Sequence, residues 1–237
     1  ADSIGFSQDQ KIKEIIDGAI DAEATRIDLT YKKSTSSTKD KEVKLFKSKD
    51  NGHGFNNPVV GIIEELTSWG KKKIGIGKIG TFGIGTTQEF KEWLTQDEAE
   101  IKIHSTDKKG RWADAYSEVD EDGHIYYDIA DNMHGQCSEK SGTDFTIDGI
   151  DTSMRTSILI RDIQACYYPT YKKYKDKGIE FIMTLNGDTI PFIDPLYRNV
   201  PNEDGVKKTW KKSVKVGNDT FEIIAVGLFP EFIKRNR

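Results

Sequence analysis

A short turn that sets one carboxylate among glycines is the segment of this chain best suited to chemistry. It reads Asp50-Asn51-Gly52-His53-Gly54 and directly follows an alternating segment that predicts a strand at 42–49. A carboxylate fixed at a strand end on a tight glycine turn suits a buried polar ligand edge, such as the amino group of a purine. Taken alone, Asn-Gly is also a strong signal for a plain hairpin turn, so its neighbours must decide the function.

Several local elements are expected to position this turn. Residues 8–23 predict an amphipathic helix, because apolar side chains recur there at three- and four-residue intervals (Ile12, Ile15, Ile16, Ala19 and Ile20). The alternation at 26–32 predicts the first strand, and 58–66 predicts a second helix. The segment 69–85 holds six glycines, too many for a helix interior. Thr86 and Thr87 would cap a helix through Leu94.

The second half of the chain is expected to be mostly strands. Residues 100–160 contain five short alternating segments, the last of them at 156–160, with turns at Lys109-Gly110 and Asp122-Gly123. A helix is predicted at 162–174 with a break before Pro169. The remaining predicted elements are strands at 180–185 and 189–193 and a hairpin of 213–216 with 220–226.

Four features occur in one order: Glu14 on the first helix, the Asp50 turn, the glycine segment Gly80–Gly85, and Ser141-Gly142-Thr143. Together they resemble the GHKL ATPases, named for gyrase, heat-shock chaperones, histidine kinases and MutL. The family's first helix reads E-x-x-x-N-x-x-D-A, and residues 14–22 here read EIIDGAIDA. The resemblance covers about residues 8–160.

The resemblance implies an α/β fold, a two-layer sandwich of helices on a mixed, mostly antiparallel sheet, known as the Bergerat fold. It implies an ATP-binding domain at 1–165, followed at 166–237 by the start of a transducer-like module. It also implies ATP as ligand and a lid that closes over the triphosphate, gating a conformational change or homodimerisation on nucleotide binding.

Site residues follow from the same resemblance. Glu14 would orient or deprotonate the attacking water as the catalytic residue. Asp50 would accept a hydrogen bond from the adenine amino group, supported by Thr143. The other residues implied to bind ATP lie in the turn and the lid: Gly52, Gly54, Gly80, Gly83, Ile84, Gly85 and Thr86. The amides that open the Thr86 helix would face the phosphates.

One position departs from the family pattern. The family's Mg²⁺-binding Asn is Gly18 here, so no protein side chain is assigned as a metal ligand. Magnesium would be held mainly by phosphate and water oxygens, since it keeps several waters in most sites. The sequence therefore favours ATP binding more strongly than ATP hydrolysis. A slow ATPase and a nucleotide sensor without useful turnover both remain open.

Composition limits the other classes. The formal net charge of -4 gives no global argument for nucleic acid, yet leaves it open as a partner. Cys137 and Cys166 lack metal-binding spacing, and the four histidines lack the spacing of a helical zinc pair. No apolar run is long enough to cross a bilayer, so we expect no membrane partner and an intracellular location, cytoplasmic or nuclear.

Other motifs favour rival functions only weakly. Residues 75–80 satisfy G-x-G-x-x-G, but no apolar strand precedes them and more glycines come after them, unlike a dinucleotide-binding site. The downstream motifs of a protein kinase are missing. A two-component kinase is disfavoured because no phosphoacceptor helix precedes the domain. The lysines at 71–73 and 207–212 are better explained as solvated surface than as ligand contacts.

Overall fold

An eight-stranded mixed sheet is the centre of the structure, a computed structural model that describes residues 8–34, 43–67, 90, 92–95, 97–120, 124–133, 139–194, 206–216 and 219–228. The chain divides into two compact units. The first comprises Ala1–Arg161 with Tyr174–Ile190, and the second comprises Asp162–Lys173 with Pro191–Arg237. Each unit is described by itself.

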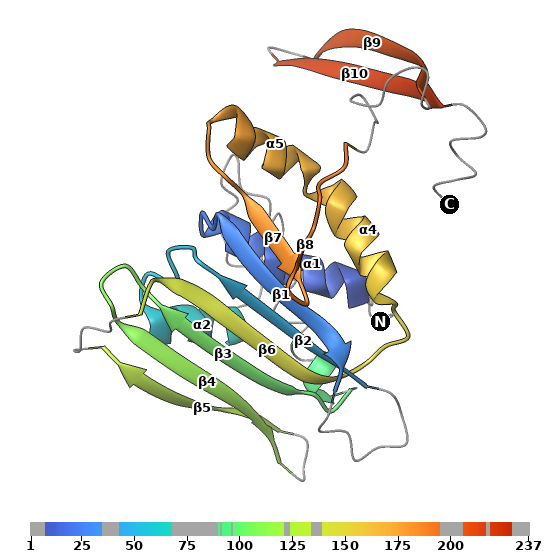
Figure 1. Cartoon of the computed structure of the whole chain (residues 1–237). Coiled ribbons are helices and arrows are strands. Elements are labelled where there is room, and N and C mark those ends of the chain that lie inside the picture. The colour runs from blue at the N-terminus through green and yellow to red at the C-terminus, as the bar shows by residue number, and fades with distance from the viewer. Residues whose placement is uncertain are drawn as a thin grey trace. The chain divides into compact units, whose positions relative to one another are not determined.

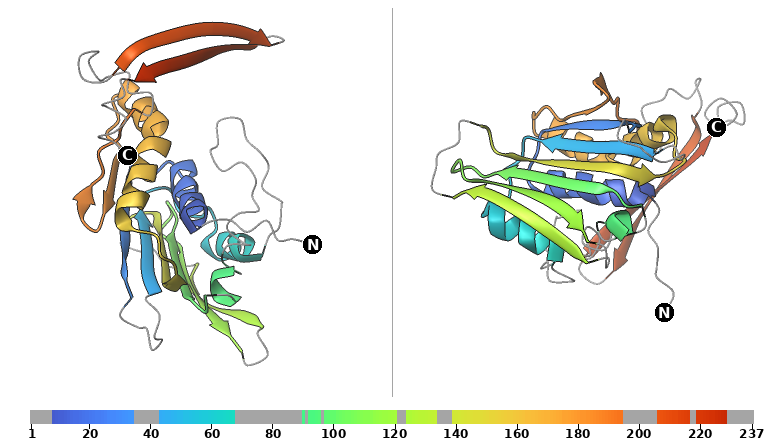
Figure 2. Two further views of the ribbon diagram at one scale, coloured as in Figure 1. Left: turned by 90° about the vertical axis from the view of Figure 1, so that its right-hand side faces the viewer. Right: turned by 90° about the horizontal axis from the view of Figure 1, so that it is seen from below.

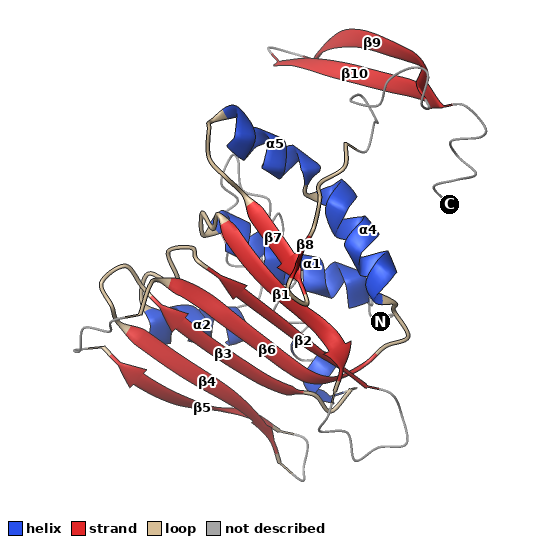
Figure 3. Cartoon of the chain, viewed as in Figure 1, coloured by secondary structure: helices blue, strands red, loops and turns tan. Residues whose placement is uncertain are grey.

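The sheet of the first unit has the strand order β5-β4-β3-β6-β2-β1-β7-β8 (Figures 1 and 3). Its strands are β1 (Arg26–Lys33), β2 (Val43–Asp50), β3 (Glu100–Thr106), β4 (Trp112–Val119), β5 (Ile125–Asn132), β6 (Gly142–Asp151), β7 (Ile182–Leu185) and β8 (Asp188–Thr189). β1 and β7 pair in parallel, whereas the other paired strands of this sheet are antiparallel. β6 pairs with both β2 and β3, so it joins the two halves of the sheet.

Helices α1 (Gln8–Asp21) and α2 (Pro58–Thr67) lie on the same face of this sheet (Figure 2). The predicted isoleucine stripe of α1 is buried, as are Ile27, Leu29, Phe46 and Phe145 of the strands. Alternate strand residues point to opposite faces, so the other face carries Asp28, Lys49, Asp144 and His104. The two-layer α/β fold with a mostly antiparallel sheet is therefore as the sequence predicts.

The segment Thr156–Ile160 corrects one prediction. It was expected to be a strand, but it forms the first turns of α4 (Thr156–Cys166). Leu159 and Ile163 are fully buried while Ile158 is 40% exposed, so burial follows a four-residue spacing. The segment has only three apolar residues, Ile158 to Ile160, which fit either period, and the helical spacing from Leu159 to the next buried residue, Ile163, decides for the helix.

A second helix, α5 (Tyr168–Asp176), begins just after α4 ends, with Pro169 as its second residue. The predicted break before Pro169 is therefore confirmed. Strand β8 is shorter than expected, because only Asp188 and Thr189 pair with β7. The turn between them has positive φ at Asn186 (53°) and Gly187 (93°), as a two-residue hairpin of the Asn-Gly type requires.

Residues beyond position 165 complete the main sheet. The side chain of Asn186 accepts a hydrogen bond from the N–H of Tyr31 (2.9 Å) and donates one to its carbonyl (3.0 Å). β7 is thereby fixed beside β1. The domain boundary at 165 and a transducer-like module at 166–237 stay predictions.

The second unit contains an antiparallel hairpin of β9 (Val206–Val216) and β10 (Asp219–Leu228). The predicted hairpin is confirmed, and its first strand is longer than expected. The turn residues Gly217 and Asn218 lie outside the described residues.

Candidate functional site

Asp50 is the last residue of β2, and its carboxylate is buried on the helix-covered side of the sheet. It is only 8% exposed and stands opposite the fully buried Ile27 of β1. Its Oδ1 accepts a hydrogen bond of 2.7 Å from the N–H of Gly52. Burial raises the pKa of this carboxyl to about 6, although backbone N–H groups of Gly52 and Thr143 act in the opposite direction. A carboxylate has room for about four hydrogen bonds, so Asp50 keeps capacity to accept more.

The glycines of the turn are required by the packing of the chain against itself. A Cβ on Gly52 would lie 2.7 Å from the carbonyl oxygen of Ala22. Gly54 has φ of 64°, and a Cβ there would run into the carbonyl of Thr106. The sequence suggested that these glycines make room for a ligand. Their first effect in the structure is to let the turn close against the end of α1 and the end of β3.

Asn51 fixes the same turn from the other side. Its Oδ1 accepts hydrogen bonds from the N–H groups of Thr25 (2.9 Å) and Arg26 (2.8 Å). The N–H of His53 donates to the carbonyl of Ala22 at 2.9 Å. The Asn of the motif is thus a structural residue that ties β2 to the segment following α1.

Thr143 lies beside Asp50, on the second residue of β6. It is 6% exposed, and its backbone N–H donates to the Asp50 carboxylate. Gly142, just before it, has φ of 155°, and a Cβ at that position would collide with the carbonyl of Asp50. The Gly-Thr pair therefore lies directly against Asp50. That the two form parts of one ligand pocket stays a prediction.

Ser105 completes this group and was missed by the sequence reasoning. It lies on β3, is fully buried, and its Oγ is 3.2 Å from Oγ1 of Thr143. The same Oγ accepts a hydrogen bond of 3.0 Å from the N–H of Phe55. The available signal was a serine in phase with the buried Ile101 and Ile103, a polar residue on an apolar face.

Glu14 and Gly18 lie on α1, one turn apart, so they share a face of the helix. The carbonyl of Gly18 accepts the N–H of Ala22, the residue that packs against Gly52. This places the Gly18 turn of the helix next to the Asp50 turn. Gly18 is exposed, and a Cβ there would meet nothing within 4 Å. A Cβ can therefore be added at this position without moving the backbone.

The predicted lid residues Gly80, Gly83, Ile84, Gly85 and Thr86 lie outside the described residues. The helix expected after them is described at 90 and 92–95. There Glu92 forms an ion pair of 2.7 Å with Lys11 of α1, whose Nζ also lies 5.6 Å from the ring centroid of the fully buried Trp93. The segment after the predicted lid is thus anchored to the helix that carries Glu14.

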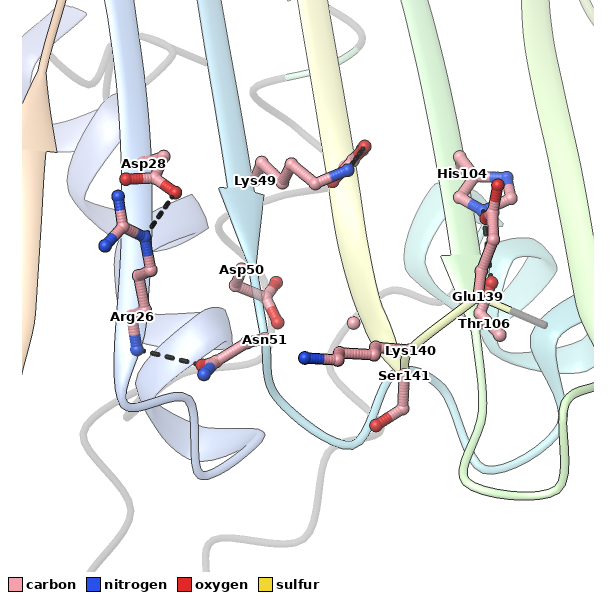
Figure 4. A pocket seen from close by; sticks show the side chains of 12 residues that line it. Arg26, Asp28, Lys49, Asp50, Asn51, His104, Thr106, Glu139, Lys140 and Ser141 are labelled. Atoms are coloured by element: carbon pink, nitrogen blue, oxygen red, sulfur yellow. Dashed lines mark hydrogen bonds and ion pairs between the residues drawn. The ribbon is translucent and has the colours of Figure 1, made fainter. Parts of the chain in front are cut away.

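A pocket of about 470 Å³ opens at the end of the sheet where β2 finishes with Asp50 and Asn51 follows, and charged and polar residues of the uncovered face line much of it (Figure 4). These polar side chains pair with one another. Arg26 Nε lies 2.8 Å from Asp28, Lys49 Nζ lies 2.9 Å from Asp144, and His104 Nδ1 lies 2.7 Å from Asp114. These paired residues alternate along their strands with the residues that face α1. The pairs therefore lie on the opposite side of the sheet from the Asp50 carboxylate.

Within the described part of the chain, no group of three or more His, Cys, Asp or Glu side chains could hold a metal ion. Among the described helices, none is long and apolar enough to cross a membrane.

Solved structures of type II topoisomerase ATPase domains share this fold. The ATPase and transducer domains of DNA topoisomerase II from Balamuthia mandrillaris match with a TM-score of 0.55 and 13% identity over 91% of this chain and 55% of that chain. Two structures of the ATPase region of Saccharomyces cerevisiae topoisomerase II match equally well, also with a TM-score of 0.55. One, bound to ICRF-187 (dexrazoxane), is 11% identical and the other 10%, and each match covers 89% of this chain and 56% of that chain.

These neighbours have the two-layer α/β fold that the motif resemblance implies, so the predicted fold is confirmed. This chain spans little more than half the length of the structures it matches. No family model and no curated protein match the sequence.

Proposed function

We propose that this chain is an ATP-binding module in which Asp50 accepts a hydrogen bond from the adenine amino group. The observation that carries the proposal is the buried Asp50 carboxylate, held by two backbone N–H groups beside the hydroxyl of Thr143. A buried carboxylate is stable only when its charge is compensated, and the two N–H groups do this in part. A ligand amino group would supply a further donor.

The fold supports the same proposal. The neighbours are described as ATPase domains, and their α/β arrangement is the one found here. The Asp50 turn, the end of α1 and the first residues of β6 meet at one place in this arrangement. The base would bind there, and the triphosphate would extend toward the face of α1 that carries Glu14 and Gly18.

Magnesium would neutralise phosphate charge and align the triphosphate when bound. The chain offers no side chain for it at position 18, where the space is open. Phosphate and water oxygens would therefore hold most of the metal's coordination shell. Glu14, one turn earlier on the same helix face, would act on the attacking water as a general base.

Calorimetry with a non-hydrolysable ATP analogue tests the binding proposal. Asp50→Ala is expected to abolish binding while the protein stays folded, because the variant lacks the acceptor for the adenine amino group. Asp28→Asn is the matched control, since Asp28 is an acid of the adjacent strand that lies on the uncovered face of the sheet. Equal affinity of the wild type and Asp50→Ala would refute the site.

A nucleotide sensor without useful turnover is the second candidate, and Gly18 is the residue that favours it. Phosphate release with and without Mg²⁺ separates the two candidates. Release by the wild type that disappears in Glu14→Ala supports the ATPase. Tight binding without release in either protein supports the sensor. Nucleotide-dependent dimerisation, measured by analytical ultracentrifugation, would test the proposed output of lid closure.

A further inference from the structure

The large sheet ends in a long edge strand, β5. Among the described strands it pairs only with β4, over its whole length from Ile125 to Asn132 (Figure 3). The strand at the opposite edge, β8, is only two residues long. An open edge is a template for another strand, and many proteins protect it with proline, lysine or a β-bulge. β5 contains neither proline nor lysine, and its register with β4 has no shift.

The turn that joins β4 to β5 shows which backbone groups of β5 point outward. Asp120 lies across from His124, and its N–H donates to the carbonyl of His124 at 3.0 Å. That carbonyl therefore points toward β4. Backbone groups of an antiparallel strand point alternately to its two sides, so those of Ile125, Tyr127 and Ile129 point away from β4. This edge thus carries a regular row of outward N–H and C=O groups.

The side chains of this edge are incompletely buried although several are apolar. Ile125, Tyr127 and Ile129 lie on the helix-covered side of the sheet and are only half-buried. Val119 of β4, across from Ile125, is 44% exposed. On the other side of the sheet Tyr126 is 55% exposed. A further strand beside β5 would therefore cover apolar surface as well as pair backbone groups.

A second copy of β5 matches this edge in an antiparallel register. With a two-fold axis at Tyr127, Ile125 lies across from Ile129 of the second copy, and Tyr127 lies across from itself. Tyr126 then lies across from Asp128 of the second copy. The outward backbone groups meet in the same pairs and can exchange hydrogen bonds. No two like charges of the strand lie directly across from each other, an arrangement that would be unfavourable.

The neighbouring registers fit less well. A two-fold axis at Asp128 would set two carboxylates across from each other, and an axis at Ile129 would set Tyr127 across from Asp131. An axis at Tyr126 would pair only three residues of the strand. A shift by a single residue would bring apolar side chains to the wrong side of the sheet. The apolar pattern and the charges therefore select the register centred on Tyr127.

We infer that β5 is a self-association surface, through which two copies of this chain form a two-fold symmetric dimer with one continuous sheet. The same surface of each copy makes the contact, as in most symmetric dimers. It involves one strand from each copy, so the dimer is weak and reversible. It forms without nucleotide, which distinguishes it from the dimerisation proposed for lid closure.

Sedimentation velocity of the full chain without nucleotide, over a wide range of protein concentration, tests the inference. The wild type should show an equilibrium between monomer and dimer. Tyr126→Lys places an ammonium group across from Asp128 of the second copy and should tighten the dimer. Tyr126→Asp places a carboxylate there and should weaken it. The dissociation constants of the two variants should differ by about tenfold or more, because each charge pair occurs twice in a symmetric dimer.

Tyr116→Lys and Tyr116→Asp are the matched controls. Tyr116 is 43% exposed, lies on the same side of the sheet and belongs to β4, one strand further from the edge. It lies across from Asp128 within its own sheet, just as Tyr126 lies across from Glu118. The controls change the net charge by the same amounts, so their dissociation constants should differ much less. Circular dichroism checks that every variant is folded.

Cross-linking reports the register itself. In a chain whose Cys137 and Cys166 are replaced by serine, Tyr127→Cys places a thiol across from its own copy and should form an intermolecular disulfide under a mild oxidant. Asp128→Cys, one residue further along, should cross-link more slowly. Faster cross-linking of Asp128→Cys would contradict the register.

Three results of the sedimentation experiment would overturn the inference. One is a wild type that stays monomeric at every concentration or dimerises only with ATP. Another is a dimer whose dissociation constant is the same in both Tyr126 variants, since it would use another surface. The third is growth beyond the dimer, because the two-fold pairing occupies both β5 edges and leaves only the short β8 edges free.

Discussion

Lys11 of α1 and Glu92 form a buried ion pair, with Nζ and Oε2 separated by 2.7 Å and the two side chains 5% and 12% exposed. The pair joins the helix that carries Glu14 to the helix that comes after the predicted lid. Removal of one partner would leave an uncompensated charge in the interior. The pair is therefore a structural link between two proposed parts of the site.

Glu92→Gln should lower the free energy of unfolding by about 3 kcal/mol, because it leaves the Lys11 ammonium buried without its counter-charge. Urea denaturation measures the change. The double variant Lys11→Met with Glu92→Gln removes both charges and should recover part of the loss. Equal stability of Glu92→Gln and the wild type would show that the pair does not hold the two helices together.

Gly54→Ala should destabilise the protein by more than the backbone conformation alone explains. At φ of 64° a side chain costs about 1–2 kcal/mol, and the new Cβ would also collide with the Thr106 carbonyl. Gly178 has φ of 70° with nothing near its Cβ position, so Gly178→Ala isolates the conformational cost. In urea denaturation we expect Gly178→Ala to lower the free energy of unfolding by about 1 kcal/mol and Gly54→Ala to lower it by at least twice as much. Similar costs for the two variants would contradict close packing of the turn on β3.

Asp50 should make the folded state less stable as the pH rises. Its pKa is raised from 3.8 to about 6, so the folded protein favours the protonated form. That stability is fully present below pH 4 and is lost as the pH rises through about 6. The side chain at position 50 cannot ionise in Asp50→Asn. As the pH rises from about 4 to 7.5, the free energy of unfolding of this variant should therefore increase by up to about 3 kcal/mol relative to that of the wild type.

Asp28→Asn should behave in the opposite way. Burial tends to raise the pKa of Asp28, but hydrogen bonds from Arg26 and Thr184 hold it below its ordinary value. The Asp28 carboxylate therefore stabilises the fold at neutral pH and ceases to do so as the pH falls through its lowered pKa. Chemical denaturation across about pH 3–8 compares the variants. If the difference in unfolding free energy from the wild type changed with pH in the same direction for both variants, burial would be ruled out as the cause of the raised pKa of Asp50.

Gly18→Asn should increase Mg²⁺-dependent phosphate release. The position is exposed, a Cβ meets nothing within 4 Å, and asparagine is no worse than glycine inside a helix. The new amide oxygen would give the metal a protein ligand. Gly18→Ala provides the control, since it changes the helix in the same way without adding an oxygen. A rise of about tenfold in Gly18→Asn alone would attribute slow turnover to the missing ligand. Identical rates in the two variants would show that Gly18 does not limit catalysis.

The sequence by itself determined the elements whose information is local. In 8–21 the isoleucines keep a helical spacing through several turns, and in β1 and β2 the apolar residues alternate along the strand. Each pattern fits one period only, so the helix and the two strands are predicted correctly. The Asn186-Gly187 turn was also readable, because few residues tolerate positive φ at both positions. The run at 156–160 was too short for its period to be recognised.

Only the tertiary structure decided which distant residues meet. Ser105 contacts Thr143 because β3 pairs with β6, 38 residues further along the chain, and no local pattern fixes that partner. The pairing of β6 with β2 likewise presses Gly142 against the carbonyl of Asp50. Composition and spacing identified the carboxylate, the glycines and the threonine, but which of their atoms come within hydrogen-bond distance of Ser105 or of one another depends on distances between strands. Those distances exist only once the sheet has formed.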